Sequence, residues 1–267
     1  MKWLKEYIHS LKSLHAEEYV DIYFFRPPAY FIIKLFFSLP LTPNHYSLFS
    51  LVSGLSASYF FLRGGPSYLK IGACFFLLSS ILDCCDGMLA RLKKNGSPFG
   101  KIIDGVVDYI VNLAVFISLT YALSQSSSHF LYFPIAYLLP IAGLSKIFHS
   151  WIYDYYLTKF LNCEEKKIFN IEDEILKIKK LMPHQENNLK EKFKKGSLLI
   201  YIGYLKAQNR ACSTRCIESP ELYCQINLKN IRYWSYIGPS MHNFLLIFFL
   251  LLGSIYPYLL FSIILAN

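Results

Sequence analysis

Long apolar runs separated by short polar linkers dominate this chain and predict membrane-spanning helices. Five runs approach or exceed the roughly 20 residues that a helix needs to cross a bilayer. They cover residues 44–62, 66–92, 97–124, 129–152 and 232–252. A sixth run, 255–266, follows the turn from Gly253 to Pro257 and amounts to about 18 Å of helix, thin against a hydrocarbon core of about 30 Å. The pattern predicts an all-α, polytopic membrane protein with a bundle of six transmembrane helices.

The N-terminal residues 1–40 follow a different pattern and predict a segment at the membrane surface. Within residues 1–25, apolar residues recur at helical spacing, and Lys and Glu lie between them. The apolar residues are Trp3, Leu4, Ile8, Leu11 and Leu14. This pattern is typical of an amphipathic helix in the interface plane, and a partly ordered tail is the alternative. The run 30–39 is too short to span and predicts a re-entrant or interfacial helix. Thr42 then suits the N-cap of the first span, with Pro43 as its first helical residue.

Polar residues return over residues 162–230, where Lys-rich and Glu-rich patches predict a solvated helical hairpin. The chain therefore divides into four predicted parts. They are an N-terminal amphipathic and interfacial segment (1–40), a catalytic transmembrane core with the first four spans (41–161), a cytoplasmic helical insert (162–230) and the last two spans (231–267).

Composition and charge agree with a membrane protein. Of 267 residues, 54% are hydrophobic and 17% are charged, whereas a soluble domain averages about 25% charged. This excludes a disordered, collagen-like or disulfide-stapled chain. The net charge of +9 is concentrated near the linker 93–96 and in the insert, and the loop 124–129 has no Lys or Arg. The positive-inside rule then places the N-terminus, the linker and the insert in the cytoplasm, with the protein in a bacterial inner membrane. No nucleic-acid partner is expected, because no binding module accompanies the charge.

Four aspartates interrupt two apolar helices at positions where hydropathy alone predicts none. Asp83 and Asp86 lie near the end of the second predicted span, and Asp104 and Asp108 near the start of the third. A charged side chain at the bilayer centre costs about 2.5–3.5 kcal/mol on insertion scales, so such residues usually face a cavity and mark a site. We place these four near the cytoplasmic ends of the helices, where the cost is smaller.

Helical spacing puts the carboxylates on two faces that can meet. One face holds, at i, i+3, i+4 and i+7, the residues Asp83, Asp86, Gly87 and Ala90. The other holds, at i, i+4 and i+8, the residues Gly100, Asp104 and Asp108. The linker 93–96 joins the helices as an antiparallel hairpin. Carboxylates this close repel strongly at low dielectric, and one or two divalent cations would relieve the repulsion; all-oxygen ligands favour Mg²⁺, Mn²⁺ or Ca²⁺ over zinc.

Two glycines and an arginine add a second element to these faces. Gly87 and Gly100 have no side chain to block a bulky ligand. Arg91 lies beside the acidic face, and its planar fork suits a phosphate. Together they indicate a diphosphate site at the cytoplasmic interface.

The spacing Asp86-Gly87-x2-Ala90-Arg91-x8-Gly100-x3-Asp104-x3-Asp108 resembles the signature of the CDP-alcohol phosphotransferases, also called CDP-alcohol phosphatidyltransferases. Asp83 matches the aspartate that the family has three residues earlier, and Thr42-Pro43-Asn44 is similar to its motif before the first span. The resemblance covers roughly 40–125, and the insert departs from the short link of compact members. It implies a six-span core, usually a homodimer, that transfers a phospho-group from a CDP-linked donor to an alcohol and releases CMP. We take CDP-diacylglycerol as the donor, with a CDP-linked alcohol as the alternative.

The resemblance implies a role for each matching position. It makes Asp83, Asp86 and Asp104 ligands of Mg²⁺ or Mn²⁺, with two ions expected. It makes Asp108 a ligand of the second ion and the general base that takes the proton of the acceptor hydroxyl. The positions implied to bind the CDP donor are Thr42, Pro43, Asn44, His45, Gly87, Ala90, Arg91, Ser97 and Gly100.

The acceptor pocket is less defined. Lys146 and His149, at the end of the fourth span, could line it, or they could reach the lipid headgroups. No Arg accompanies Lys146 on this span, which disfavours a phosphorylated acceptor. His242 could face the same cavity or pack in the core.

Two other functions fit parts of the pattern. An intramembrane prenyltransferase binds isoprenyl diphosphate through Asp-rich motifs, but on two well-separated helices. A cation transporter or a silent scaffold could also contain intramembrane carboxylates. Here all four aspartates lie in one hairpin with glycine and arginine at fixed offsets, which favours the phosphotransferase.

Overall fold

The computed structural model describes residues 2–125, 132–166, 170–183, 189–212 and 219–267. These residues form helices joined by turns, with no strand among them. The predicted all-α class is therefore confirmed for the described chain.

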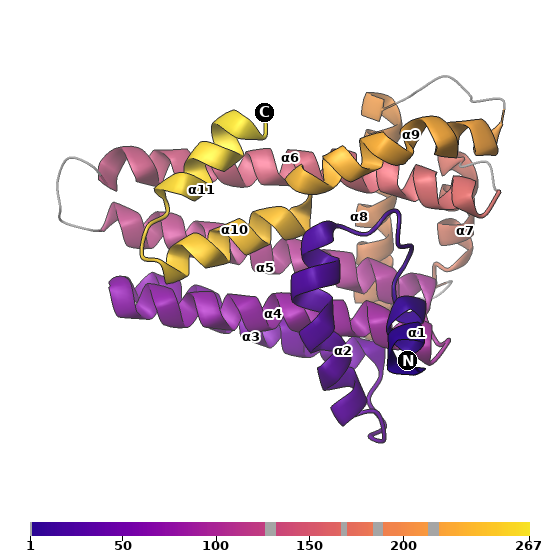
Figure 1. Cartoon of the computed structure of the whole chain (residues 1–267), viewed down its shortest axis with the longest axis horizontal. Coiled ribbons are helices and arrows are strands. Elements are labelled where there is room, and N and C mark those ends of the chain that lie inside the picture. The colour runs from indigo at the N-terminus through magenta and orange to yellow at the C-terminus, as the bar shows by residue number, and fades with distance from the viewer. Residues whose placement is uncertain (1, 126–131, 167–169, 184–188, 213–218) are drawn as a thin grey trace.

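Four long helices lie side by side and form the body of the molecule (Figure 1). They are α3 (Pro43–Arg63), α4 (Pro66–Leu92), α5 (Pro98–Ser124) and α6 (Tyr132–Glu164). Helix α3 packs against both α4 and α5, and α5 packs against α6. The predicted spans 44–62, 66–92 and 97–124 coincide with α3, α4 and α5 to within one residue. The predicted start of the fourth span at 129 lies outside the described residues, and α6 continues beyond the predicted end at 152 as far as Glu164.

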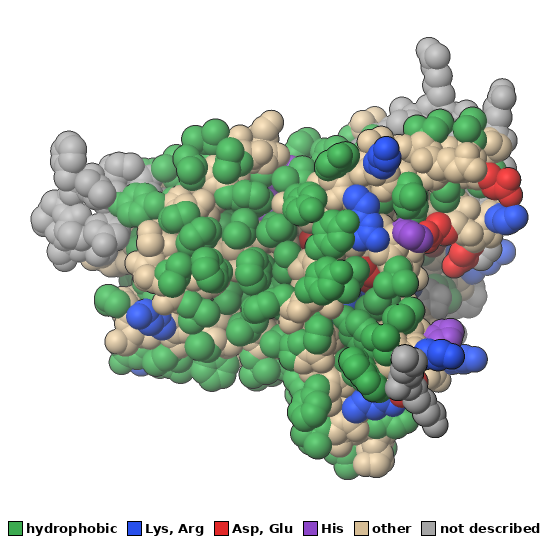
Figure 2. Space-filling view, in the orientation of Figure 1, with side chains coloured by type: hydrophobic (Ala, Val, Ile, Leu, Met, Phe, Trp, Pro, Cys, Tyr) green, Lys and Arg blue, Asp and Glu red, His purple; other side chains and the backbone are tan. Residues whose placement is uncertain are grey.

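Apolar helices of membrane-spanning length are present. In the described residues, three helical stretches are long and apolar enough to cross a bilayer: Pro66–Leu92, Phe99–Ser124 and Pro220–Leu251. Figure 2 shows hydrophobic side chains over most of the visible face, with charged groups gathered over the half that contains α1, α7 and α9. The chain is an integral membrane protein, and the count of six spans stays a prediction.

Local sequence explains where the long helices begin and turn. Thr42 is extended and precedes Pro43, the first residue of α3, as predicted. Gly64 and Gly65 have φ of 65° and 82°, which lets the chain reverse into α4 without a Cβ penalty. Helix α4 ends at Leu92, and Lys94 adopts the left-handed conformation with φ of 52°. The basic linker thus breaks the helix as predicted, and α4 and α5 run antiparallel on α3.

The C-terminal part differs from the prediction. The predicted fifth span 232–252 falls in the candidate stretch Pro220–Leu251, but that stretch is not one α-helix. It consists of α9 (Pro220–Trp234), a 3₁₀ turn at Ser235–Ile237 and α10 (Pro239–Leu251). Gly238 is extended, and Pro239 begins the new helix because proline has no N–H to continue the old one. Helix α10 packs against α4 and α6, and α11 (Tyr256–Leu260), which continues in a π-helical turn at Phe261–Leu265, packs against α6.

The N-terminal segment is shorter in helix than predicted. Helix α1 spans only Lys2–Ser10, so a single helix over 1–25 is wrong. The hydroxyl of Ser10 donates to the carbonyl of Tyr7 (2.6 Å), and the carboxylate of Glu17 accepts the backbone N–H of Lys12 (2.7 Å). These bonds turn the chain toward the π-helical turn η1 (Asp21–Phe25) and α2 (Arg26–Leu35), which crosses the long helices in Figure 1.

The insert contains α7 (Ile171–Lys180), α8 (Leu189–Cys212) and the helix α9. The expectation of a solvated hairpin is wrong for one face of α7 and α8, which packs against α5 and α6. The buried cluster there consists of Ile102, Tyr155, Ile171, Ile178, Leu198, Ile202 and Leu205. The apolar residues between the charges of the insert therefore extend the core instead of facing water.

Candidate functional site

A cavity of about 1720 Å³ lies beside α4, α5 and α6. Its polar part is lined by the four aspartates that the sequence singles out, Asp83, Asp86, Asp104 and Asp108. Its apolar part continues along α5 and α6, past Leu113, Phe116, Ile117, Leu144 and Ile147. A second cavity of about 220 Å³ borders the same aspartates from the side of the N-terminal segment. The acidic faces of α4 and α5 therefore meet, as predicted.

Three of the carboxylates form a cluster. Asp83, Asp86 and Asp104 each offer an oxygen, and these oxygens lie within 4.8 Å of one another. Asp83 is repelled by each of the other aspartates. Asp104 Oδ1 is buried and has no hydrogen-bond partner in the described part of the chain. An unpartnered buried oxygen inside an all-oxygen donor set fits a hard divalent cation such as Mg²⁺ or Mn²⁺.

A serine from α3 fixes one member of this cluster. Ser47 Oγ donates a hydrogen bond of 2.6 Å to Asp86 Oδ2, and both side chains are buried. The bond occupies one lone pair of Asp86 and orients the carboxylate, as the outer-shell partners of metal ligands commonly do.

Asp108 lies outside the three-carboxylate cluster and belongs to a second polar network. Asn112 Nδ2 donates to Asp108 Oδ1 (2.8 Å). The ammonium of Lys146 donates to the amide oxygens of Asn112 and of Asn243 on α10. Lys146 is buried, lines the large cavity and attracts the Asp108 carboxylate. The network joins α5, α6 and α10 and links a carboxylate to an ammonium through the Asn112 amide.

Arg91 lies over Gly87 at the edge of the cavity. A Cβ at Gly87 would be 3.5 Å from both Nη atoms of Arg91. Arg91 Nε donates to the carbonyl of Ser10, while Nη2 is buried without a partner among the described residues. A guanidinium with an unused donor beside a carboxylate cluster suits a phosphate group. Ala90 lines the same cavity.

The turn before α3 meets the start of α5 at the cavity. Ser97 is the N-cap of α5, and its Oγ accepts the N–H of Gly100 (2.9 Å). A Cβ at Gly100 would lie 3.0 Å from Ser97 Oγ and 3.6 Å from Asn44 Oδ1, so glycine permits this close approach. These three residues line the large cavity, as do Thr42 and Pro43.

The sequence from the turn before α3 through the first part of α6 has known relatives. Residues 40–158 match the CDP-alcohol phosphatidyltransferase family. This confirms the resemblance predicted from the spacing of aspartate, glycine and arginine. The matched region, less than half of the chain, contains the whole hairpin of α4 and α5.

Two curated relatives are similar to parts of this chain. One is named phosphatidylinositol phosphate synthase, from Corynebacterium glutamicum, and is 32% identical over 105 residues, which are 38% of this chain and 47% of that protein. The other is named bifunctional IPC transferase and DIPP synthase, from Rubrobacter xylanophilus, and is 39% identical over 70 residues, which are 26% of this chain and 15% of that protein. The similarity thus spans about half of the first relative and less of the second.

Other candidate residues of the phosphatidyltransferase pattern lie apart from the cavity. His45 is exposed, and its Nδ1 accepts the backbone N–H of Thr42 (3.1 Å), which is a capping contact of α3. His149 is buried, and its Nδ1 lies 3.2 Å from Nε2 of His242. His242 is fully buried and also lies 3.4 Å from the hydroxyl of Tyr258. The structure thus places both of these histidines in the helix packing between α6, α10 and α11.

Several residues at the site were missed from the sequence. Asn112 continues the stripe from Gly100 through Asp108 at the same spacing of four, so the signal was present. Ser47 lies one turn after Pro43 and is one of five serines on that span, so it gives a weaker signal. Asn243 had no signal, because its partner Lys146 lies 97 residues away.

The N-terminal segment borders the smaller cavity with buried charges. Glu17 pairs with Arg26 (2.7 Å), and Arg26 also lies 3.9 Å from Asp21. Burial raises the pKa of the Glu18 carboxyl well above its usual value, and the nearby Asp21 raises it further. Burial likewise raises the pKa of Asp21, against the lowering effect of Arg26. These charges line a cavity that the four aspartates share.

Proposed function

We propose that this protein is a CDP-alcohol phosphotransferase of phospholipid biosynthesis. It would transfer a phosphatidyl group from CDP-diacylglycerol to an alcohol and release CMP. The observation that supports this most is the cluster of Asp83, Asp86 and Asp104, within 4.8 Å and beside Arg91, inside the region that matches the family. We keep residues 41–161 as the catalytic core.

The shape of the large cavity supports a lipid-linked donor. Its acidic part continues into a part lined by apolar side chains of α5 and α6. A diphosphate at the carboxylates would place a cytidine and a diacylglycerol on opposite sides, and acyl chains require an apolar surface. Basic side chains for the phosphates also line this cavity: Lys12, Arg91, Lys101, Lys146 and Lys177.

Asp83, Asp86, Asp104 and, from the second network, Asp108 would hold one or two Mg²⁺ or Mn²⁺ ions. Bound there, divalent cations neutralise the diphosphate and stabilise charge on the leaving CMP. Ser47 would keep Asp86 oriented toward this position. Arg91 would bind a phosphate oxygen through its free Nη2.

Asp108 would accept the proton of the acceptor hydroxyl. The acceptor oxygen bonds to the donor phosphorus next to the lipid, the bridging P–O bond breaks, and CMP leaves. Asn112 would hold Asp108 Oδ1 in place, and the amide oxygen of the same asparagine accepts a hydrogen bond from the Lys146 ammonium. The contribution of Asp108 would come from its position beside an oriented hydroxyl, since metal-bound carboxylates are weak bases.

Lys146 would also face the acceptor, because it lines the cavity next to Asp108. His149 would act indirectly, through its contact with His242 on the helix that provides Asn243. The first relative is named for the synthesis of phosphatidylinositol phosphate, so an inositol phosphate belongs among the acceptors to be tested here. Besides Lys146 on α6, Lys177 on α7 of the insert lines the same cavity, and a second ammonium makes a phosphorylated acceptor compatible with the site.

The test is CMP release by the purified full chain in lipid nanodiscs, with CDP-diacylglycerol, Mg²⁺ or Mn²⁺ and a panel of labelled alcohols that includes inositol, inositol phosphate and glycerol phosphate. Mass spectrometry of the lipids identifies the acceptor. We expect metal-dependent CMP release that Asp108→Asn abolishes. If no CDP-linked donor yields CMP, the proposal fails. Competition by isoprenyl diphosphate, or cation flux without nucleotide, would favour the prenyltransferase or the transporter.

We further propose six spans, a cytoplasmic active site and a homodimer. The charged side chains gathered at the end with α1, α7 and α9 support that orientation under the positive-inside rule. Labelling of single cysteines with a membrane-impermeant thiol reagent in inverted and right-side-out vesicles tests the orientation. Light scattering of the protein in detergent, with the detergent mass subtracted, tests the dimer.

A further inference from the structure

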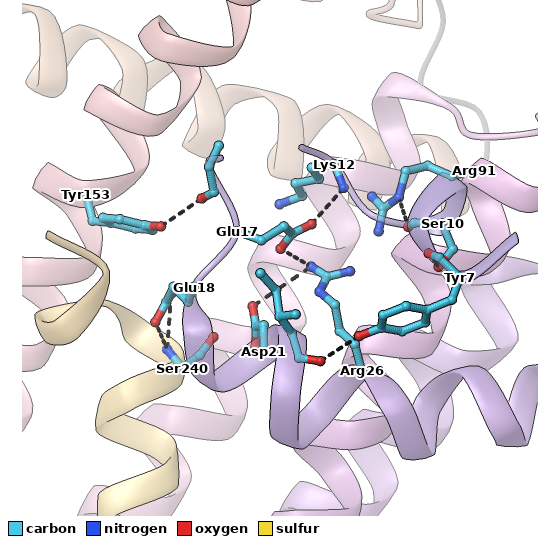
Figure 3. A network of polar contacts seen from close by, with 12 residues as sticks. Tyr7, Ser10, Lys12, Glu17, Glu18, Asp21, Arg26, Arg91, Tyr153 and Ser240 are labelled. Atoms are coloured by element: carbon cyan, nitrogen blue, oxygen red, sulfur yellow. Dashed lines mark hydrogen bonds and ion pairs between the residues drawn. The ribbon is translucent and has the colours of Figure 1, made fainter. Parts of the chain in front are cut away.

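The residues Ser10 to Glu18, which we call the N-terminal strap, run from Arg91 on α4 to Ser240 at the start of α10 (Figure 3). At one end, the carbonyl of Ser10 accepts the hydrogen bond from Arg91. In the middle, the carbonyl of Ala16 accepts a hydrogen bond of 3.1 Å from the hydroxyl of Tyr153 on α6. The strap is therefore fixed to two helices of the site before it reaches the third.

The other end of the strap caps α10. The carboxylate of Glu18 accepts the backbone N–H groups of Ser240 and Met241 (both 3.2 Å) at the first turn of that helix. A Cβ at Gly238 would lie 2.5 Å from this carboxylate, so glycine makes room for it. Unpaired N–H groups at a helix start favour an anion. The strap is thus bound at both ends and is part of the folded core.

Glu17 is already satisfied by other groups. Its carboxylate pairs with Arg26 at 2.7 Å and accepts the backbone N–H of Lys12 at 2.7 Å. Among the described residues, no ion pair within 4 Å involves the Lys12 ammonium. Lys12 is held by its backbone, and its side chain remains available.

Lys12 lines both cavities of the site. Four aspartates line the same two cavities, and the Lys12 ammonium acts to lower the pKa of Asp21, which lines the smaller one. Arg91, the candidate phosphate ligand, is anchored only two residues away, at Ser10. Lys5, on α1, is exposed as Lys12 is, but it lines neither cavity. The strap thus brings one particular lysine to the acidic site.

We propose that Lys12 is a substrate-binding residue that contacts the diphosphate of the CDP donor on the side opposite the carboxylate cluster. This rests on the proposed function. A diphosphate bound at the aspartates turns some of its oxygens away from them, and these oxygens need cationic donors at the rim. Arg91 provides one donor and Lys12 the other, so the N-terminal segment outside the family match completes the donor site. The phosphate of an anionic lipid headgroup is the other source of the same chemistry.

The experiment is a titration of the full chain in phosphatidylcholine nanodiscs with CDP and with CMP, both in the presence of Mn²⁺. Lys12→Met removes the ammonium and keeps the length of the side chain, and its anchoring bond persists because it uses the backbone N–H. Lys12→Arg keeps the charge. Lys5→Met is the matched control from the same N-terminal segment.

We expect Lys12→Met to weaken CDP binding about tenfold, as the loss of one charge-assisted hydrogen bond does. CMP binding should change less, so the ratio of the two affinities falls. Lys12→Arg, which keeps the charge, should recover most of the CDP affinity that Lys12→Met loses, and Lys5→Met should bind CDP like the wild type. Equal CDP affinity in Lys12→Met and the wild type would overturn the inference. So would a parallel loss of CDP and CMP binding, which indicates a displaced strap.

A lipid role would also overturn the inference. It would appear as a Lys12→Met effect that is absent in phosphatidylcholine and arises only when anionic lipid is added. Absence of any CDP binding by the wild type, by contrast, would contradict the proposed function itself. Thermal unfolding of each variant confirms that the strap remains folded.

Discussion

A substitution at Gly87 can distinguish an effect on folding stability from an effect on ligand binding. A Cβ at this position would lie 3.5 Å from the two Nη atoms of Arg91, an ordinary van der Waals distance. The fold can therefore accept Gly87→Ala without a shift. Replacing a glycine inside a helix by alanine stabilises that helix by roughly 0.5–1 kcal/mol. The variant should be at least as stable as the wild type.

A donor bound in the cavity beside Gly87 would be in contact with this added methyl group. Inserting a methyl group into a filled site costs about 1–3 kcal/mol, which corresponds to roughly a 5- to 150-fold loss of kcat/KM. We therefore expect Gly87→Ala to unfold at the same or a slightly higher temperature and to lose CMP release from CDP-diacylglycerol within that range. The effect should be in KM for the donor rather than for the acceptor.

Gly203→Ala is the matched control. Gly203 also lies inside a helix, α8, where an added Cβ would meet no neighbouring group within 4 Å among the described residues, and it lines neither cavity. This variant should keep the kcat/KM of the wild type. If Gly87→Ala has full activity, the slot over Gly87 does not hold the donor. If it unfolds at a clearly lower temperature, the packing around Arg91 is not as described.

Three further predictions concern residues around the site. Asn112→Leu removes the partner of both Asp108 and the buried Lys146. We expect kcat for CMP release to fall about tenfold and the free energy of unfolding to decrease by about 1–3 kcal/mol. An unchanged kcat would contradict the network. Ser47→Ala removes the hydrogen bond to one oxygen of Asp86. The Mn²⁺ concentration at half-maximal activity should rise at least about tenfold, which is the usual loss of metal affinity when an outer-shell partner is removed. An unchanged concentration would show that Ser47 does not orient Asp86. Glu18→Gln tests the buried carboxyl of Glu18, whose pKa is raised in the folded state. The folded state therefore binds this proton more tightly than the unfolded state does. As a result, the wild type loses stability as the pH rises from about 4.5 through the pKa of the folded state. Gln does not titrate and keeps an oxygen for the N–H groups of α10, so its unfolding temperature should gain on the wild type as the pH rises; a constant difference would refute the assignment.

The helix hairpin and its acidic faces could be predicted because they depend on local periodicity. The apolar runs of α4 and α5 are long, the linker between them breaks the helix, and the spacing of Asp83 and Asp86 places both on one helix face. The cap at Thr42 followed from the preference of proline for the first helical position. These features need no knowledge of the rest of the chain.

The N-terminal strap could not be predicted, because its anchors are long-range and largely involve backbone groups. The carbonyls of Ser10 and Ala16 have no signature in the sequence, and Glu18 contacts a helix 222 residues away. The same holds for the insert, whose apolar face is covered only after α8 packs on α5. The role of His45 was also hidden, since a histidine beside a signature motif does not reveal that it caps a helix.

The most direct test of the central claim is Mn²⁺ binding by the full chain in the presence of CDP. The binding is measured by electron paramagnetic resonance. If Asp83, Asp86 and Asp104 form the metal centre of a CDP-dependent transferase, the wild type binds Mn²⁺ saturably, and Asp104→Asn weakens that binding at least about tenfold. Asp173→Asn on the exposed side of α7 should bind like the wild type. Equal Mn²⁺ binding by the wild type and Asp104→Asn, or no saturable binding by the wild type, would contradict the account.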